Sequence, residues 1–164
     1  LMIIVFSGTP GTGKTTVSKE FAKKKRWKYV DVNGVIDDNE LIEKYDSARD
    51  TFVVNEKKLS KILVDMIKKS KNLIIDSHMA HYIPKKYVDI VFVTKCDLRM
   101  LKKRLEYRKY KPKKVRENMD AEIFDICLNE AIELKHKVII LDTTHDNVKK
   151  LLKVIQDAIG KNKR

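Results

Sequence analysis

Three glycines, a lysine and two threonines follow an apolar run close to the start of the sequence. They are Gly8, Gly11, Gly13, Lys14, Thr15 and Thr16, shortly after residues 3–6. The spacing G-x-x-x-x-G-K-[ST] is that of a phosphate-binding loop. Its glycines let successive backbone N–H groups converge on one phosphate, and the start of the next helix adds a partial positive charge. The pattern predicts a nucleotide phosphate site; the alternative is a glycine-rich turn that binds nothing.

Side chains in and after this loop have the chemistry that a magnesium nucleotide requires. Lys14 is expected to hold the β- and γ-phosphates, and the hydroxyl of Thr15 to ligate Mg²⁺. Asp76 directly follows the apolar residues 73–75, so it is expected to end a buried strand and to act on the metal from its second coordination shell. His78 could orient a water or a substrate phosphate, or could simply be exposed in the loop after the strand.

Apolar runs and amphipathic stretches alternate along the rest of the chain. Further strands are expected over residues 27–32, 73–76, 88–94 and 137–141. Helices are expected over residues 15–25, 55–69, 97–108, 117–134 and 147–159. The alternation predicts one α/β domain, residues 1–164, of the P-loop NTPase type. Its doubly wound five-stranded parallel sheet would carry helices on both faces and bind its ligand at the carboxyl ends of the strands.

Two stretches between these elements are less regular. Residues 37–54 are acidic, and Leu41, Ile42 and Tyr45 give them a short helical face. Further on, Pro112 is expected to interrupt a basic loop.

Composition restricts the class of protein. The 164 residues are 43% apolar. No apolar run approaches the roughly 18 residues that a membrane span needs, so no membrane association is expected. Cys96 and Cys127 lie far apart, which indicates neither a zinc site nor a disulfide framework and favours a cytoplasmic location.

Positive charge is concentrated in one segment. The net charge is +13, and residues 99–116 contain ten lysines and arginines against a single acid, Glu106. We expect this segment to contact phosphate or nucleic acid. A solvated charged face is the alternative.

A second nucleotide motif competes with this interpretation. Residues 94–97 read Thr-Lys-Cys-Asp, which resembles the [NT]-K-x-D signature with which GTPases read guanine. However, residues 76–79 lack the glycine of the D-x-x-G switch, and no S-A-K triplet follows the fifth strand. Asp97 is therefore better interpreted as the cap of a helix.

The chain resembles the adenylate kinase isoenzyme 6 family, in an archaeal type. The resemblance spans nearly the whole chain, and its specific parts are Asp76-Ser77-His78, residues 104–110, Glu117-Asn118 and residues 121–123. Members of that family are small nucleoside monophosphate kinases that also hydrolyse ATP and take part in small-ribosomal-subunit maturation. The resemblance therefore implies Mg²⁺-dependent use of ATP, with AMP or another monophosphate as acceptor.

The resemblance also implies roles for particular residues. ATP-phosphate ligands would be Gly11, Gly13, Lys14, Thr15 and Thr16. Arg108 would be the lid arginine that holds ATP, with Arg104 on the same helix face. Residues 31–54 would form the monophosphate-binding insert, and residues 104–114 the lid. The catalytic set would be Lys14, Asp76, His78, Arg104 and Arg108.

One position departs from the family pattern. Asp37 stands where the family places an arginine in the insert, and a carboxylate cannot pair with an acceptor phosphate. Arg49, Lys44 or a basic residue elsewhere must substitute, or acceptor affinity is low. His81 likewise stands where some members carry a second acid. Kinase activity that is weak relative to ATPase activity is one expected consequence.

Three hypotheses of function remain open from the sequence. The first is an ATP:monophosphate phosphotransferase with ATPase activity. The second is an ATP-driven assembly factor of the small ribosomal subunit, whose basic segment meets rRNA or a platform ribosomal protein. The third is a kinase of another small metabolite.

Overall fold

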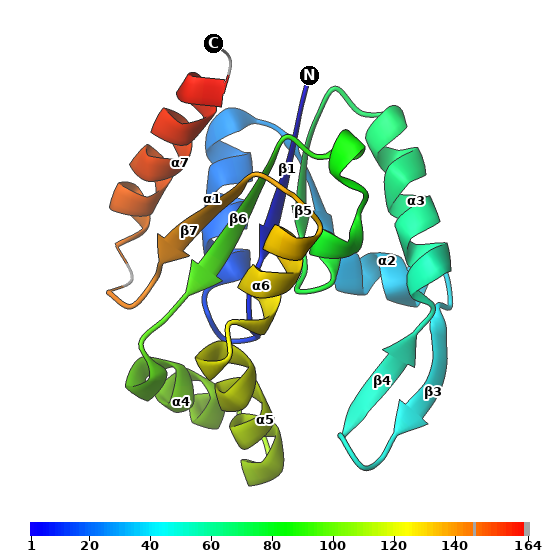
Figure 1. Cartoon of the computed structure of the whole chain (residues 1–164), viewed down its shortest axis with the longest axis vertical. Coiled ribbons are helices and arrows are strands. Elements are labelled where there is room, and N and C mark those ends of the chain that lie inside the picture. The colour runs from blue at the N-terminus through cyan, green and yellow to red at the C-terminus, as the bar shows by residue number, and fades with distance from the viewer. Residues whose placement is uncertain (146, 163–164) are drawn as a thin grey trace.

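The computed structural model describes residues 1–145 and 147–162 (Figure 1). Five parallel strands form the central sheet in the order β2-β5-β1-β6-β7. Their bounds are β1 (Met2–Ser7), β2 (Lys28–Asp31), β5 (Asn72–Asp76), β6 (Ile90–Lys95) and β7 (Val138–Asp142). The predicted five-stranded parallel sheet of an α/β fold is thereby confirmed.

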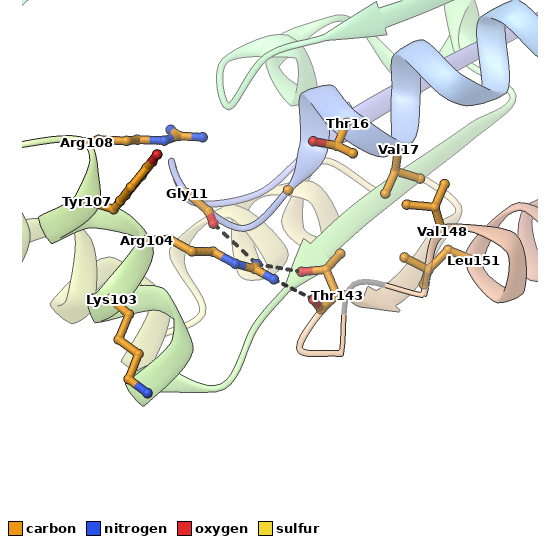
Figure 2. A pocket seen from close by; sticks show the side chains of 11 residues that line it. Gly11, Thr16, Val17, Lys103, Arg104, Tyr107, Arg108, Thr143, Val148 and Leu151 are labelled. Carbon is orange, nitrogen blue, oxygen red and sulfur yellow. Dashed lines mark hydrogen bonds between the residues drawn. The ribbon is translucent and has the colours of Figure 1, made fainter.

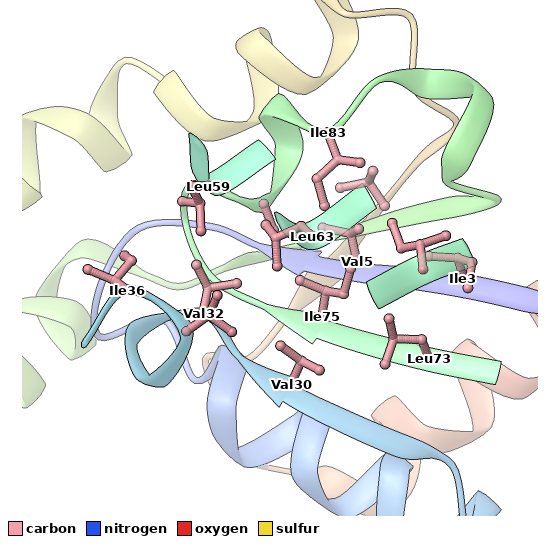
Figure 3. Packing of buried hydrophobic residues seen from close by; sticks show 14 of the residues in the cluster. Ile3, Val5, Val30, Val32, Ile36, Leu59, Leu63, Leu73, Ile75 and Ile83 are labelled. Carbon is pink, nitrogen blue, oxygen red and sulfur yellow. The ribbon is translucent and has the colours of Figure 1, made fainter. Parts of the chain in front are cut away.

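Helices cover both faces of this sheet because its central strand, β1, is apolar on both sides. Every residue of β1 is buried, and Ile4 and Phe6 face α1 (Lys14–Lys25) and α7 (Val148–Asn162). On the opposite face, Ile3 and Val5 pack against α3 (Glu56–Lys68), α2 (Val32–Asp38) and α6 (Ile126–Glu133). Figure 3 shows Leu59 and Leu63 of α3 above this face of the sheet. Burial on both sides is what the continuous apolar runs require.

Residues 42–54 form a hairpin rather than the short helical face expected there. β3 (Ile42–Asp46) pairs antiparallel with β4 (Thr51–Val54), and the rings of Tyr45 and Phe52 lie 5.4 Å apart across the two strands. The Asp46 carboxylate accepts hydrogen bonds from the N–H groups of residues 48 and 49, which fixes the turn. A helix needs a surface on which to bury its apolar stripe, and this segment projects from the body of the molecule (Figure 1).

The basic segment is more helical than expected. α4 (Leu98–Tyr107) begins after Asp97, whose carboxylate accepts from the N–H groups of residues 99 and 100, so the predicted cap is confirmed. Pro112 does not interrupt a loop but starts α5 (Pro112–Ile123), where its fixed φ suits the first helical turn. The prediction of a single helix over residues 117–134 is wrong. Asp125 adopts a left-handed backbone conformation (φ 52°), and it separates α5 from α6.

Two short 3₁₀ turns, η1 (Ala80–Tyr82) and η2 (Lys85–Tyr87), connect β5 to β6. Among the described helices, none combines the length and apolar character needed to cross a membrane.

Candidate active site

Residues 8–16, here called the phosphate-binding loop, comprise the connection from β1 to α1 at the carboxyl end of the sheet and the first three residues of α1. Gly8 has φ +135°, and a Cβ there would lie 2.5 Å from the carbonyl oxygen of Thr94. Gly11 has φ +91°, and its Cβ would lie 2.9 Å from the side chain of Leu105. The positive φ favours glycine at both positions, and at Gly8 a Cβ would also collide with the backbone of β6.

Buried threonines hold the loop in shape. The Thr12 hydroxyl donates to the carbonyl of Thr9 at 2.6 Å and lies 2.7 Å from the hydroxyl of Thr94. Thr143, which follows β7, donates to the carbonyl of Thr12 at 2.6 Å. The protein itself therefore sets the loop conformation, so its N–H groups are oriented before a phosphate arrives.

Lys14 extends from the start of α1 into the cleft beside the loop. Its Nζ donates to the carbonyl of Thr9 at 3.3 Å. Burial lowers the pKa of the Lys14 amine, and the negative charge of Asp76 opposes this decrease. An ammonium group that has lost much of its hydration is well suited to take a phosphate as its partner.

Asp76 ends β5 and is 4% exposed. Tyr29 of β2 donates its hydroxyl proton to Asp76 Oδ2 at 2.7 Å. Within the described residues, the buried Oδ1 has no hydrogen-bond partner. A buried carboxylate oxygen without a hydrogen-bond donor is costly. Asp76 lines the cleft together with Thr15. Hard oxygen donors of this kind fit Mg²⁺ and its bound waters.

One cleft of about 240 Å³ collects most of the residues predicted from the sequence. Those that line it are Gly11, Gly13, Lys14, Thr15, Thr16, Asp76, His78 and Arg108. Gly8 does not line the cleft but lies at the base of the loop. Four further lining residues received no role of their own from the sequence, although two of them lie in the stretches that carry the family resemblance: Pro10, Asn33, Ser77 and Tyr110.

Two residues of β2, Asp31 and Tyr29, contribute to the site although the sequence assigned neither a role in it. Asp31 lines the cleft and lies opposite Asp76 in the register of β2 and β5, because both end adjacent parallel strands. Its carboxylate accepts from the N–H of Asn33 and so caps α2. The strand-end position that identified Asp76 was not apparent for Asp31, because the sequence predicted a strand that continues to residue 32, whereas β2 ends at Asp31. Tyr29 gave no comparable signal.

His78 lies at the mouth of the cleft. Although the residue reaches solvent, the surrounding protein desolvates the ring and lowers the pKa of His78 to about 4, with a further contribution from the charge of Lys14. At neutral pH the imidazole is therefore uncharged, and it can accept or donate a hydrogen bond at the cleft.

A second pocket of about 410 Å³ adjoins the same loop (Figure 2). Val17, Val148 and Leu151 form an apolar wall, and Tyr107 and Arg108 lie on the other side. Arg108 lines both this pocket and the cleft, so it connects the two.

Arg104 and Arg108 differ in their surroundings despite their spacing of four residues. Figure 2 shows the Arg104 guanidinium turned toward Thr143. It donates to the Thr143 carbonyl at 2.8 Å, with longer contacts of 3.3 Å to the sulfur of Cys96 and 3.5 Å to the carbonyl of Gly11. Arg104 thus holds together the loops that form the pocket, whereas Arg108 lies over the cleft.

The residues of the competing guanine motif have other partners. Lys95 pairs with the carboxylates of Glu122, at 3.4 Å, and Asp125. Asp97 caps α4. Neither lines the cleft or the second pocket.

Part of the basic segment is used within the molecule. Lys113 and Lys114 donate to the carbonyls of Ala48 and Arg49 at the tip of the hairpin, and Lys111 lies 3.5 Å from the carboxylate of Asp50. The exposed remainder includes Arg99, Lys103, Lys109 and Arg116. Asp37 is exposed on α2 and does not line the cleft.

Comparisons with known proteins agree with this architecture. A family model described as an AAA domain matches residues 4–125. A protein of Methanocaldococcus jannaschii named "Putative adenylate kinase" is 38% identical over 162 residues, which cover 99% of this chain and 88% of that protein. "Adenylate kinase isoenzyme 6 homolog FAP7" of Saccharomyces cerevisiae is 34% identical over 158 residues, which cover 93% and 79% of the two chains.

Solved structures show the same fold at low sequence identity. Shikimate kinase from Acinetobacter baumannii, in complex with shikimate, superposes with a TM-score of 0.70 at 16% identity and covers 99% of this chain and 95% of its own. Shikimate kinase from Bacteroides thetaiotaomicron gives a TM-score of 0.66 at 16% identity, with coverages of 97% and 98%. These likenesses concern the fold.

Proposed function

We propose that this chain, which belongs to the family of adenylate kinase-like proteins that includes the isoenzyme 6 homologues, transfers the γ-phosphoryl group of ATP to a nucleoside monophosphate. The acceptor we propose is AMP, so that ATP and AMP yield two ADP. The observation that carries this proposal is a single cleft in which Lys14, Asp76 and Arg108 meet the first residues of the acceptor insert.

The donor nucleotide fits along the phosphate-binding loop. Its base would occupy the second pocket, between the apolar wall of Val148 and Leu151 and the side chain of Tyr107. Its phosphates would follow the N–H groups of the loop and the start of α1 into the cleft. The base is thus held by apolar contact, and the phosphates by backbone donors and positive charge.

Charge neutralisation is the main catalytic contribution of this chain's residues. Lys14 and Arg108 approach the cleft from opposite elements, α1 and the end of α4, and would stabilise negative charge on the transferring phosphoryl group. Thr15 and Asp76 would hold Mg²⁺, which when bound neutralises phosphate charge and orients the phosphate oxygens. Tyr29 orients the Asp76 carboxylate, because it occupies Oδ2 and leaves Oδ1 available.

The acceptor would enter from the side of the insert, residues 31–54. Asp31 and Asn33 line this end of the cleft, and the hairpin tip reaches the first turn of α5 in the proposed lid, residues 104–114. With Asp37 exposed and acidic, the insert itself offers the acceptor phosphate little positive charge. We therefore propose a low acceptor affinity and accompanying ATPase activity.

Product analysis tests the proposal. The purified chain is incubated with Mg·ATP, with and without AMP, and ADP and free phosphate are quantified. Two ADP for each ATP and AMP consumed is the expected result. A panel of other monophosphates and of hydroxyl-bearing metabolites covers the third hypothesis. If the chain phosphorylates none of these acceptors, the kinase proposal is contradicted.

A second candidate function is ATP-driven assembly of the small ribosomal subunit in the cytoplasm. It is favoured by exposed basic residues of this segment that line neither the cleft nor the second pocket, Arg99, Lys109 and Arg116, and by the resemblance to the isoenzyme 6 family. The partner would be rRNA or a platform ribosomal protein. Its test is binding of the chain to small-subunit rRNA and to that protein over a series of salt concentrations, with affinity expected to fall as salt rises.

A further inference from the structure

Glu122, in the last turn of α5, is a buried carboxylate with an unusual set of partners. The residue is 5% exposed. Its Oε2 accepts from the hydroxyl of Thr9 at 2.7 Å, and its Oε1 accepts from the N–H of Cys96 at 3.1 Å and lies 3.4 Å from Lys95 Nζ. A buried carboxylate is costly unless such donors satisfy it, and an apolar residue would fill the space at lower cost. Packing alone therefore does not explain it.

The partner Thr9 stands between Glu122 and Lys14. Thr9 is 1% exposed, and its hydroxyl is held by Glu122. Its carbonyl oxygen accepts from Lys14 Nζ at 3.3 Å and from the Thr12 hydroxyl at 2.6 Å. One residue of the phosphate-binding loop thus connects a carboxylate on α5 to the lysine in the cleft.

We propose that Glu122 is a positioning residue that, through Thr9, holds Lys14 where the transferring phosphoryl group will be. This inference rests on the phosphotransferase function proposed above. Glu122 touches no substrate in this scheme; it orients Thr9, and the Thr9 carbonyl orients the lysine.

The contact also restricts how the proposed lid can move. The start of α5 contacts the hairpin through Lys113 and through Lys111, which directly precedes the helix, while its last turn is bonded to the phosphate-binding loop through Glu122. A helix anchored at its end cannot swing away as a rigid unit without breaking these bonds. Opening would instead begin at the first turn and the preceding loop, where Lys109 adopts φ 57°.

Thr9 offers the cleanest test because a change there spares the contacts of Glu122 with Lys95 and Cys96. Thr9→Val removes the hydroxyl with little change in volume, and Thr9→Ser keeps a hydroxyl. Loss of one hydrogen bond to a buried charge should lower kcat about tenfold in Thr9→Val. ATP affinity should change less, and Thr9→Ser should restore kcat. A Thr9→Val enzyme with the kcat of the wild type would overturn the proposal.

Glu122→Gln provides the second arm. It should lower kcat more than it weakens ATP binding, and adding Thr9→Val to it should cause little further loss of kcat. Independent, additive losses would contradict a shared role. Glu117→Gln, another acid on α5, is the matched control and should keep the wild-type kcat. Circular dichroism checks folding; if Glu122→Gln fails to fold, the Thr9 pair still decides.

The wild-type enzyme in the same assay separates this inference from the proposed function. A wild type that phosphorylates no acceptor contradicts the proposed function. An active wild type with unaffected Thr9→Val contradicts only the role of Glu122.

Discussion

The two walls of the cleft are built differently. The donor wall, formed by the phosphate-binding loop, is buried and held by hydrogen bonds of 2.6–2.7 Å from Thr12, Thr143 and Thr9. The acceptor wall ends in a hairpin on which Tyr45 is 51% and Phe52 58% exposed. Long lysine side chains connect this hairpin to the proposed lid.

This difference separates the expected tasks of the two walls. A preorganised donor wall stabilises charge without reorganising during the reaction, so changes there should lower kcat. An exposed hairpin held by surface lysines can open and close at low cost, so changes there should mainly alter the acceptor KM. The following predictions test that separation, from the largest expected effect to the smallest.

The largest loss of ATP turnover is expected on removal of Lys14, which belongs to the donor wall. Lys14→Ala removes the positive charge beside the loop and should abolish ATP turnover while the fold persists, because the lysine is not part of the apolar core. Turnover by product analysis and folding by circular dichroism are the measurements. Turnover near the wild-type rate would contradict the proposal that this loop and its lysine bind the phosphates of ATP.

The second-largest effect is expected at Arg108, because it lines the cleft, whereas Arg104 lines only the second pocket. Arg108→Ala is expected to lower kcat by a factor on the order of 10³ and to weaken ATP binding much less, since a lid arginine acts chiefly on transition-state charge. Arg104→Ala provides the contrast. With its guanidinium on the Thr143 carbonyl, its loss should raise the ATP KM and lower Tm in addition to reducing kcat. Steady-state kinetics beside ATP titrations decide both. A loss confined to RNA binding would contradict the lid assignment.

On the acceptor wall, Asp37 is the position to change. Asp37→Arg should lower the AMP KM and raise kinase flux relative to ATPase flux, if this exposed residue of α2 faces the acceptor phosphate. Asp38→Arg makes the same change of charge at the next residue of the helix and serves as the control. Equal effects of the two variants, or an unchanged ratio of products, would show that position 37 does not contact the acceptor.

A smaller effect is expected at the contact between hairpin and lid. Lys111 is 76% exposed and lies 3.5 Å from Asp50, so Lys111→Gln should raise the acceptor KM by at most about fivefold. The effect should vanish at high salt, where exposed pairs are screened. Lys109→Gln changes a nearby lysine outside this contact and should leave the acceptor KM unaltered. A salt-independent effect on kcat would contradict the expected separation of the walls.

The last expectation concerns acid stability and is negligible at neutral pH. Burial is the largest cause that lowers the pKa values of His78, His81 and His136, so these rings are neutral in the folded protein. The unfolded chain takes up protons at an ordinary pKa near 6.5, so protonation favours the unfolded state below that pH. Stability should therefore decline as the pH falls from about 6.5 toward 4. Tm measured across this range tests it, and His78→Gln should reduce the decline.

Much of the fold and of the donor wall could be predicted because their signals are local in the sequence. The phosphate-binding loop is a continuous motif, and buried parallel strands appear as continuous apolar runs. Asp76 was found because it ends such a run. Pro112 also carried a local signal, since proline favours the first turn of a helix, but it was interpreted as an interruption.

The tertiary structure decided what depends on residues far apart in the sequence. The apolar spacing of Ile42 and Tyr45 is compatible with a helix, and only the lack of a surface to cover, together with pairing to β4, makes it a hairpin. Arg104 matches Arg108 in helical spacing, yet the carbonyl of Thr143, 39 residues away, gives it a different role. Thr9 and Glu122 are 113 residues apart. Local sequence determines which backbone conformations are low in free energy. The partners of a buried polar group are determined only when packing brings distant segments together, because a buried group without a hydrogen-bond partner destabilises the fold.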